Sequence, residues 1–139
     1  MDFTGKLVSV LLVDDDDINN FISIKLIKKA VSSAEIIACL NGKLAIDKLL
    51  EIQREDASRL PDYILLDINM PVMNGWEFLE EYSRLNIDTA GKTKIFIISS
   101  SVFSNDINKA KSFPLVTDFV SKPLNVEKIR ELFKVSNPV

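Results

Sequence analysis

Three aspartates stand directly after apolar runs of this sequence, at the points where buried β-strands would end. Asp14 and Asp15 follow the run from Leu7 to Val13, and Asp67 follows the run from Tyr63 to Leu66. Ligands of open α/β sheets bind outside the carboxyl ends of the strands. The two acidic strand ends therefore predict one shared site.

Carboxylates gathered in one crevice repel each other unless a cation or hydrogen-bond donors compensate their charge. Mg²⁺ suits such a crevice because it prefers oxygen ligands and is typically held by one or two carboxylates together with phosphate oxygens; Mn²⁺ is the alternative ion. The chain has no glycine-rich phosphate loop, but Ser99 and Lys122 follow two further apolar runs. We therefore expect acid, hydroxyl and ammonium groups to converge.

The ordered set of these segments resembles the receiver domains of two-component response regulators, of which the single-domain chemotaxis regulator is a compact example. The segments that carry the resemblance are Val10–Asp16, Pro61–Pro71 with Asn74-Gly75, Ile97–Ser100 and Asp118–Pro123. Each alone occurs widely, whereas together they are specific and span nearly the whole chain. The resemblance implies a flavodoxin-like α/β fold, a doubly wound five-stranded parallel sheet in the order 2-1-3-4-5 with five flanking helices.

Carried over residue by residue, the resemblance makes Asp67 the acceptor of a phosphoryl group. Ser99 corresponds to the hydroxyl residue that binds a phosphoryl oxygen. Lys122 corresponds to the lysine whose ammonium balances the charge of the phosphoryl group, a role that suits a compact point charge on a flexible stem.

The resemblance also implies a set of metal ligands. Asp15 and Asp67 would bind Mg²⁺ through side-chain oxygens, Asp14 through water, and Asn69 through its backbone carbonyl. Asn69 and Ser101 match positions that influence how fast the aspartyl phosphate hydrolyses.

Phe119 has two interpretations that the sequence leaves open. It matches the family's aromatic switch, whose side chain moves inward as Ser99 is drawn toward the phosphoryl group. The alternative is an ordinary strand residue packed on the core.

The chemistry is coherent without the family name, because a carboxylate is an established covalent nucleophile for phosphoryl groups. Phosphoryl transfer depends mainly on positioning and charge neutralisation. The chain contains no histidine, so the donor phosphohistidine must belong to a partner, a sensor histidine kinase or a histidine phosphotransfer protein. We expect a protein that catalyses its own phosphorylation and dephosphorylation, rather than a conventional enzyme, and that acts on an unknown downstream protein.

Three functions of different classes are compatible with these residues. The first is a single-domain response regulator that signals by phosphorylation-dependent protein binding, with a phosphorelay shuttle as a close variant. The second is a constitutive interaction module without phosphorylation, against which the intact set of Asp67, Asp15, Ser99 and Lys122 argues. The third is an aspartate-dependent phosphatase of the haloacid dehalogenase type, which typically has a second aspartate where this chain has Asn69.

The chain must fold so that these residues meet. Apolar strands are expected at about 7–13, 35–40, 63–67, 94–99 and 117–121, alternating with helix-like stretches. Such alternation predicts a parallel sheet covered by helices. Asp16 or Asp17 is expected to cap the first helix, Asn41 the second, and the third helix should begin near Gly75.

Composition limits the alternatives. The 139 residues are expected to form one receiver domain, 1–139 with a core of about 6–134 and no output domain. The net charge of −3 and the lack of a strongly basic patch argue against nucleic-acid binding. The absence of a signal-peptide pattern and of a membrane-length apolar run predicts a cytoplasmic protein that does not bind membranes, as a monomer or a phosphorylation-dependent dimer. Cys39 is expected to be a buried core thiol.

Overall fold

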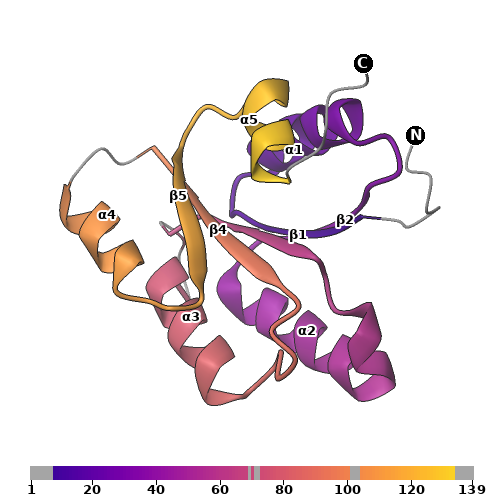
Figure 1. Cartoon of the computed structure of the whole chain (residues 1–139), viewed down its shortest axis with the longest axis vertical. Helices are drawn as coiled ribbons and strands as arrows, with labels where there is room; N and C mark the ends of the chain where they lie inside the picture. Colours follow the sequence, from indigo (N-terminus) through magenta and orange to yellow (C-terminus); the bar gives the residue numbers. More distant parts are fainter. Residues whose placement is uncertain (1–7, 69, 71–72, 101–103, 134–139) are drawn as a thin grey trace.

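A five-stranded parallel sheet forms the centre of the computed structural model, which describes residues 8–68, 70, 73–100 and 104–133. The strands are β1 (Ser9–Val13), β2 (Glu35–Cys39), β3 (Tyr63–Leu66), β4 (Lys94–Ser99) and β5 (Val116–Ser121). They pair in the order β2-β1-β3-β4-β5 (Figure 1), which confirms the predicted order. β2 and β3 end one residue before the predicted positions, and β5 begins one residue earlier.

Five α-helices alternate with the strands. They are α1 (Asp17–Ala30), α2 (Gly42–Asp56), α3 (Gly75–Arg84), α4 (Ser104–Lys111) and α5 (Val126–Leu132), with a short 3-10 helix η1 (Ala57–Arg59) after α2. The side chain of Asp16 accepts hydrogen bonds from the backbone of Ile18 and Asn19, so Asp16 caps α1 and Asp17 is its first residue. Asn41 caps α2 as predicted, and α3 begins at Gly75.

The helices cover both faces of the sheet, α1 and α5 on one face and α2, α3 and α4 on the other (Figure 1). Alternate strand side chains point to opposite faces, so each face has its own apolar core. Leu11 and Ile64 belong to the core on the α2 and α3 face, and Val10 and Leu65 to the core on the α1 and α5 face. Burial on both faces explains why the central strands read as continuous apolar runs.

Cys39 lies buried at the end of β2, as predicted, and burial raises the pKa of its thiol. Within the described ranges, no helix has both the length and the apolar character needed to cross a membrane.

Candidate functional site

Backbone pairing brings the predicted site residues to one edge of the sheet. The backbone N–H of Asp67 donates to the carbonyl of Val13 at 2.9 Å, which sets Asp67 beside the end of β1. On the other side of β3, the N–H of Lys122 donates to the carbonyl of Ser99 at 2.8 Å. The carboxyl ends of β1, β3, β4 and β5 therefore meet at the same edge, where parallel α/β sheets bind ligands.

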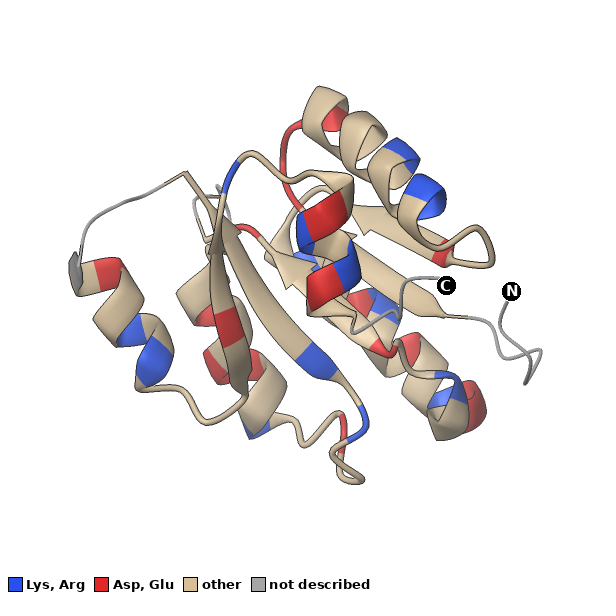
Figure 2. Cartoon of the chain, turned by 45° about the horizontal axis from the view of Figure 1, so that its top comes forward, with Lys and Arg blue, Asp and Glu red and all other residues tan. Residues whose placement is uncertain are grey.

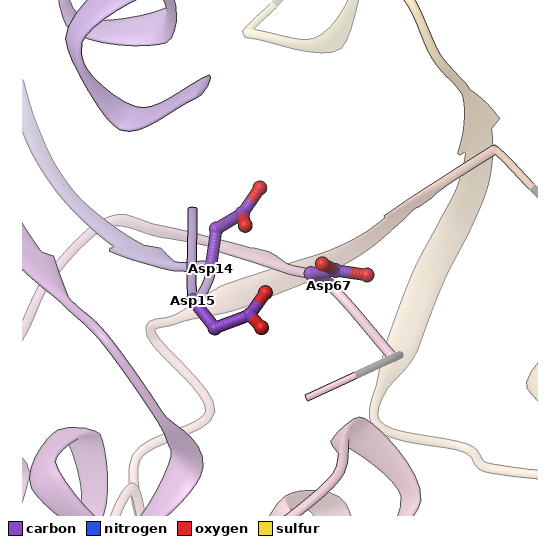
Figure 3. A group of neighbouring side chains, drawn as sticks. All are labelled: Asp14, Asp15 and Asp67. Atoms are coloured by element: carbon purple, nitrogen blue, oxygen red, sulfur yellow. The ribbon is translucent and has the colours of Figure 1, made fainter. Parts of the chain in front are cut away.

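The carboxylates of Asp14, Asp15 and Asp67 form one cluster at this edge. One oxygen from each side chain lies within 4.8 Å of the others. Figure 3 shows the three side chains together, two from the segment after β1 and one from the segment after β3. Asp15 is exposed, Asp14 is half-buried and Asp67 is 8% exposed. Three hard oxygen donors at this separation suit a divalent cation such as Mg²⁺.

The ammonium of Lys122 contacts two of the three carboxylates. Its Nζ lies 3.2 Å from Oδ2 of Asp14 and 3.7 Å from Oδ2 of Asp67. All three side chains are largely shielded from solvent, with exposed fractions of 24% for the lysine and 14% and 10% for the aspartates. The lysine therefore offsets part of the repulsion between the carboxylates. The peptide bond between Lys122 and Pro123 is cis.

Ser99 lies on β4, which pairs with β3, and Phe119 lies on β5, the edge strand beyond β4. Ser99 is the last residue of β4 and is fully buried. Phe119 is half-buried on β5 and packs against the core cluster under α2 and α3. Asn69 and Ser101, the other two predicted site positions, lie outside the described residues, and their roles remain predictions.

Asn20 is a buried polar residue that sequence reasoning missed. It is 5% exposed, and its side-chain amide donates to the backbone carbonyl of Asp14 at 2.9 Å. A carboxylate oxygen of Asp14 also accepts from the backbone of Asp16 at 2.9 Å. These bonds connect Asp14, the first aspartate of the cluster, to the start of helix α1. The signal in the sequence is an asparagine pair, Asn19-Asn20, within an otherwise apolar stretch of helix.

The segment after Asp67 is held by a capped helix and a close backbone contact. Asn74 and Glu77 form a reciprocal capping box at the start of α3. Gly75 donates its N–H to the carbonyl of Ile68 at 3.1 Å. A Cβ on Gly75 would lie 2.6 Å from the Cα of Ile68 and 3.0 Å from the carbonyl oxygen of Asp67, so glycine is required by this close approach.

A cavity of about 200 Å³ opens beside the cluster and is lined by Asp14, Asp67 and Lys122 together with apolar side chains of α1, including Ile22. The same part of α1 exposes apolar groups to solvent, with Phe21 61% and Ile22 48% exposed. The site therefore has an apolar rim next to a charged interior.

Acidic groups are concentrated in the connection between β1 and α1, whereas elsewhere the two signs of charge are mixed. Figure 2 shows this connection in red and shows both red and blue segments on the surrounding helices. Among the described residues, negative charge is therefore concentrated near the site rather than spread over one face of the protein.

Comparison with known proteins gives a consistent result. Residues 10–134 match the family model described as the response regulator receiver domain. A solved two-component response regulator from Cytophaga hutchinsonii is 37% identical, with a TM-score of 0.83 over 93% of this chain and 96% of that chain.

Two curated relatives differ in how much of their length is matched. The two-component response regulator ORR41 from Oryza sativa subsp. japonica is 31% identical over 89% of this chain and 90% of its own length. A protein-glutamate methylesterase/protein-glutamine glutaminase from Treponema pallidum is 35% identical over 86% of this chain. The match spans only 27% of the Treponema protein.

Proposed function

Because this chain belongs to the response regulator receiver domain family, we propose that it accepts a phosphoryl group on Asp67 and signals by phosphorylation-dependent binding to another protein. The strongest support is the surroundings of Asp67, which shares a cluster with Asp14 and Asp15 and lies 3.7 Å from the ammonium of Lys122. Carboxylate nucleophile, acidic cluster and lysine are the parts that this reaction needs.

The transfer reaction uses the side chains of this chain in distinct ways. A carboxylate oxygen of Asp67 attacks phosphorus and forms an O–P bond, while the bond between phosphorus and the donor breaks and the donor keeps the electron pair. Lys122 neutralises charge on the transferred group, and its present contacts with Asp14 and Asp67 hold it at that place. Ser99, at the end of β4, is assigned to hydrogen-bond a phosphoryl oxygen.

Asp14, Asp15 and Asp67 would hold Mg²⁺, with the backbone carbonyl of Asn69 as a further ligand. When bound, the ion lowers the charge of the incoming phosphoryl oxygens and of the carboxylate cluster. Asp15 is exposed at the cluster, which leaves a path for a hydrated ion. The backbone of Asp14 is held at this place by the hydrogen bond that Asn20 of α1 donates to its carbonyl.

The phosphodonor is proposed to be a histidine kinase or a histidine phosphotransfer protein. Asp67 is nearly buried, so a donor side chain must enter the site while its own protein rests on the rim. The exposed Ile18, Phe21 and Ile22 of α1 supply an apolar rim next to the cavity. Exposed apolar groups of this kind mark protein contacts.

Ser99 and Phe119 are assigned to the switch. Phosphorylation would draw the Ser99 hydroxyl toward the phosphoryl group and favour an inward position of the Phe119 side chain, which already packs against the core. Such a bias shifts a population between two arrangements and changes the affinity of the surface near β5 for a downstream protein.

Intact-mass spectrometry after incubation with acetyl phosphate and Mg²⁺ tests the proposal. We expect one phosphoryl adduct, which is absent after addition of EDTA and absent in Asp67→Asn. A persistent adduct in Asp67→Asn would place the acceptor elsewhere.

A second measurement covers rapid hydrolysis, which would hide the adduct. Beryllofluoride mimics the phosphoryl group on a carboxylate, and its addition with Mg²⁺ should change the NMR spectrum of the wild type and not of Asp67→Asn. If neither reagent has an effect, the constitutive interaction module is the better description.

A further inference from the structure

Lys128 holds the connection between β5 and α5 in which Lys122 lies. Its Nζ donates to the backbone carbonyl of Ser121 at 3.1 Å and to that of Pro123 at 3.0 Å. These two carbonyls flank Lys122 in the chain. One ammonium therefore bridges the backbone on both sides of Lys122, and hydrogen bonds from a charged donor are stronger than those between neutral groups.

The position of Lys128 is unfavourable for the helix that carries it. Asn125 caps α5 and accepts a hydrogen bond from the backbone of Lys128 at 2.8 Å, which makes Lys128 the third residue of the helix. Glutamate or glutamine at this position completes a capping box, as Glu77 does with Asn74 in α3. A cation in the first turn also opposes the helix dipole. Stabilisation of α5 therefore does not explain this lysine, whereas its contacts with the two carbonyls do.

The ammonium of Lys122 depends on this connection for its place. The Lys122 backbone is tied to β4 by the hydrogen bond to Ser99, and its side chain reaches 3.2 Å from Asp14. The flexible stem of a lysine does not fix the position of the ammonium by itself, so that position also depends on how firmly the backbone at the base of the stem is held. The bridge made by Lys128 removes one source of such movement.

We propose that Lys128 is a positioning residue for Lys122. By bridging the carbonyls of Ser121 and Pro123, it holds the ammonium of Lys122 against Asp14 and Asp67. The proposal rests on the proposed function, because it assigns Lys128 to the phosphoryl-transfer reaction through Lys122.

Three substitutions separate positioning from helix stability. Lys128→Met removes the ammonium and keeps most of the apolar stem, and we expect phosphorylation by acetyl phosphate to slow about tenfold, in line with the effects of misplaced reactive groups. Lys128→Arg keeps a donor and should restore most of the rate. Lys128→Glu completes the capping box with Asn125, so it should slow phosphorylation while the thermal unfolding temperature stays the same or rises.

Lys43→Met is the matched control. Lys43 also lies in the first turn of a helix, but its ammonium pairs with Asp47 at 3.6 Å instead of bridging backbone carbonyls. This variant should react at the wild-type rate. Equal rates for Lys128→Met and Lys43→Met would overturn the proposal, as would a loss of rate in Lys128→Glu that simply follows a loss of thermal stability.

A double substitution and a spectroscopic measurement complete the test. In a Lys122→Met background, Lys128→Met should have no further effect on rate, because Lys128 acts through the missing side chain. In the unphosphorylated protein, the NMR signal of the Lys122 ε-carbon should shift toward that of an exposed lysine in Lys128→Met. An unchanged signal would refute the positioning role, whereas failure of the wild type to accept a phosphoryl group would refute the proposed function instead.

Discussion

Gly75→Ala should damage both the fold and the site, because this glycine lies against the backbone next to Asp67. A Cβ at position 75 would lie 2.6 Å from the Cα of Ile68 and 2.8 Å from its Cγ2. Both atoms of Ile68 are in the buried segment that leaves β3. Neither can move aside as the end of a flexible surface side chain would.

The displacement can be worked out from these distances. The 2.6 Å contact must open by at least 0.4 Å to reach 3.0 Å, below which Cβ contacts essentially never occur, and by 0.8 Å to reach an ordinary van der Waals contact at 3.4 Å. Overpacking of a buried site costs about 1–3 kcal/mol. In a helix interior, alanine is more favourable than glycine by about 1 kcal/mol, and the gain is smaller at Gly75 because it is the first residue of α3. We therefore expect a net loss of about 1–2 kcal/mol in the free energy of unfolding.

The same movement should reach Asp67, the carboxylate that we propose as the phosphoryl acceptor. The carbonyl oxygen of Asp67 is 3.0 Å from the added Cβ. A misplacement of about 1 Å can cost about 100-fold in rate, so we expect phosphorylation by acetyl phosphate to slow at least tenfold.

Urea unfolding and the rate of adduct formation measure the two effects. Ser83→Ala is the control, since it places alanine at an exposed position of the same helix. If Gly75→Ala unfolds at the wild-type urea concentration, the steric argument is wrong. A destabilised variant that is phosphorylated at the normal rate would show that strain at Gly75 is not passed to Asp67.

Three further predictions follow from the site and the core. Lys122→Met should tighten Mg²⁺ binding about fivefold, because the ammonium of Lys122 competes with the ion for the carboxylates and loss of such a partly exposed ion pair is worth about 1 kcal/mol. Equal Mg²⁺ dissociation constants for the variant and the wild type, measured by titration calorimetry, would exclude this competition. Phe21→Ser should slow transfer from a phosphorylated histidine protein and leave the reaction with acetyl phosphate unchanged, and a matching loss with both donors would argue against the apolar rim as a contact for the donor protein. Burial raises the pKa of Tyr82 to about 12. The charge of Asp88 adds to this increase, and a hydrogen bond with Thr93 opposes it. In the unfolded chain the phenol ionises near pH 10, so the unfolded state loses its proton first and stability should fall as the pH rises from about 10 to about 12. Tyr82→Phe should flatten that decline in urea unfolding, and an equally steep decline would contradict the assignment.

Much of the fold could be predicted because the relevant signals are local. Strands buried on both faces require continuous apolar residues, and the runs before Asp14 and Asp67 meet that requirement. The cap at Asn41 and the helix start at Gly75 depend on residues within one turn of the chain. Element ends were less certain, since Asp16 and Asp17 are both suitable caps and only the backbone geometry selects Asp16.

The lysine contacts could not be predicted in this way. Lys122 and Asp14 are separated by 108 positions in the sequence, and their pairing depends on side-chain conformations at two different strand ends. Lys128 reads as an ordinary surface lysine of an amphipathic helix. Its bridge to the carbonyls of Ser121 and Pro123, seven and five positions earlier, depends on the course of the backbone between β5 and α5, which residue type does not reveal.

The sequence by itself determined the fold class and the edge of the sheet at which the residues of the proposed site meet, because apolar periodicity and residue type are local properties. The tertiary structure alone decided how those groups are arranged. It selected the two carboxylates that Lys122 contacts, tied Asp14 to α1 through Asn20, and left the apolar groups of α1 exposed beside the cavity. These features arise when separate elements pack together, since distance and burial are set by the whole chain rather than by any one segment.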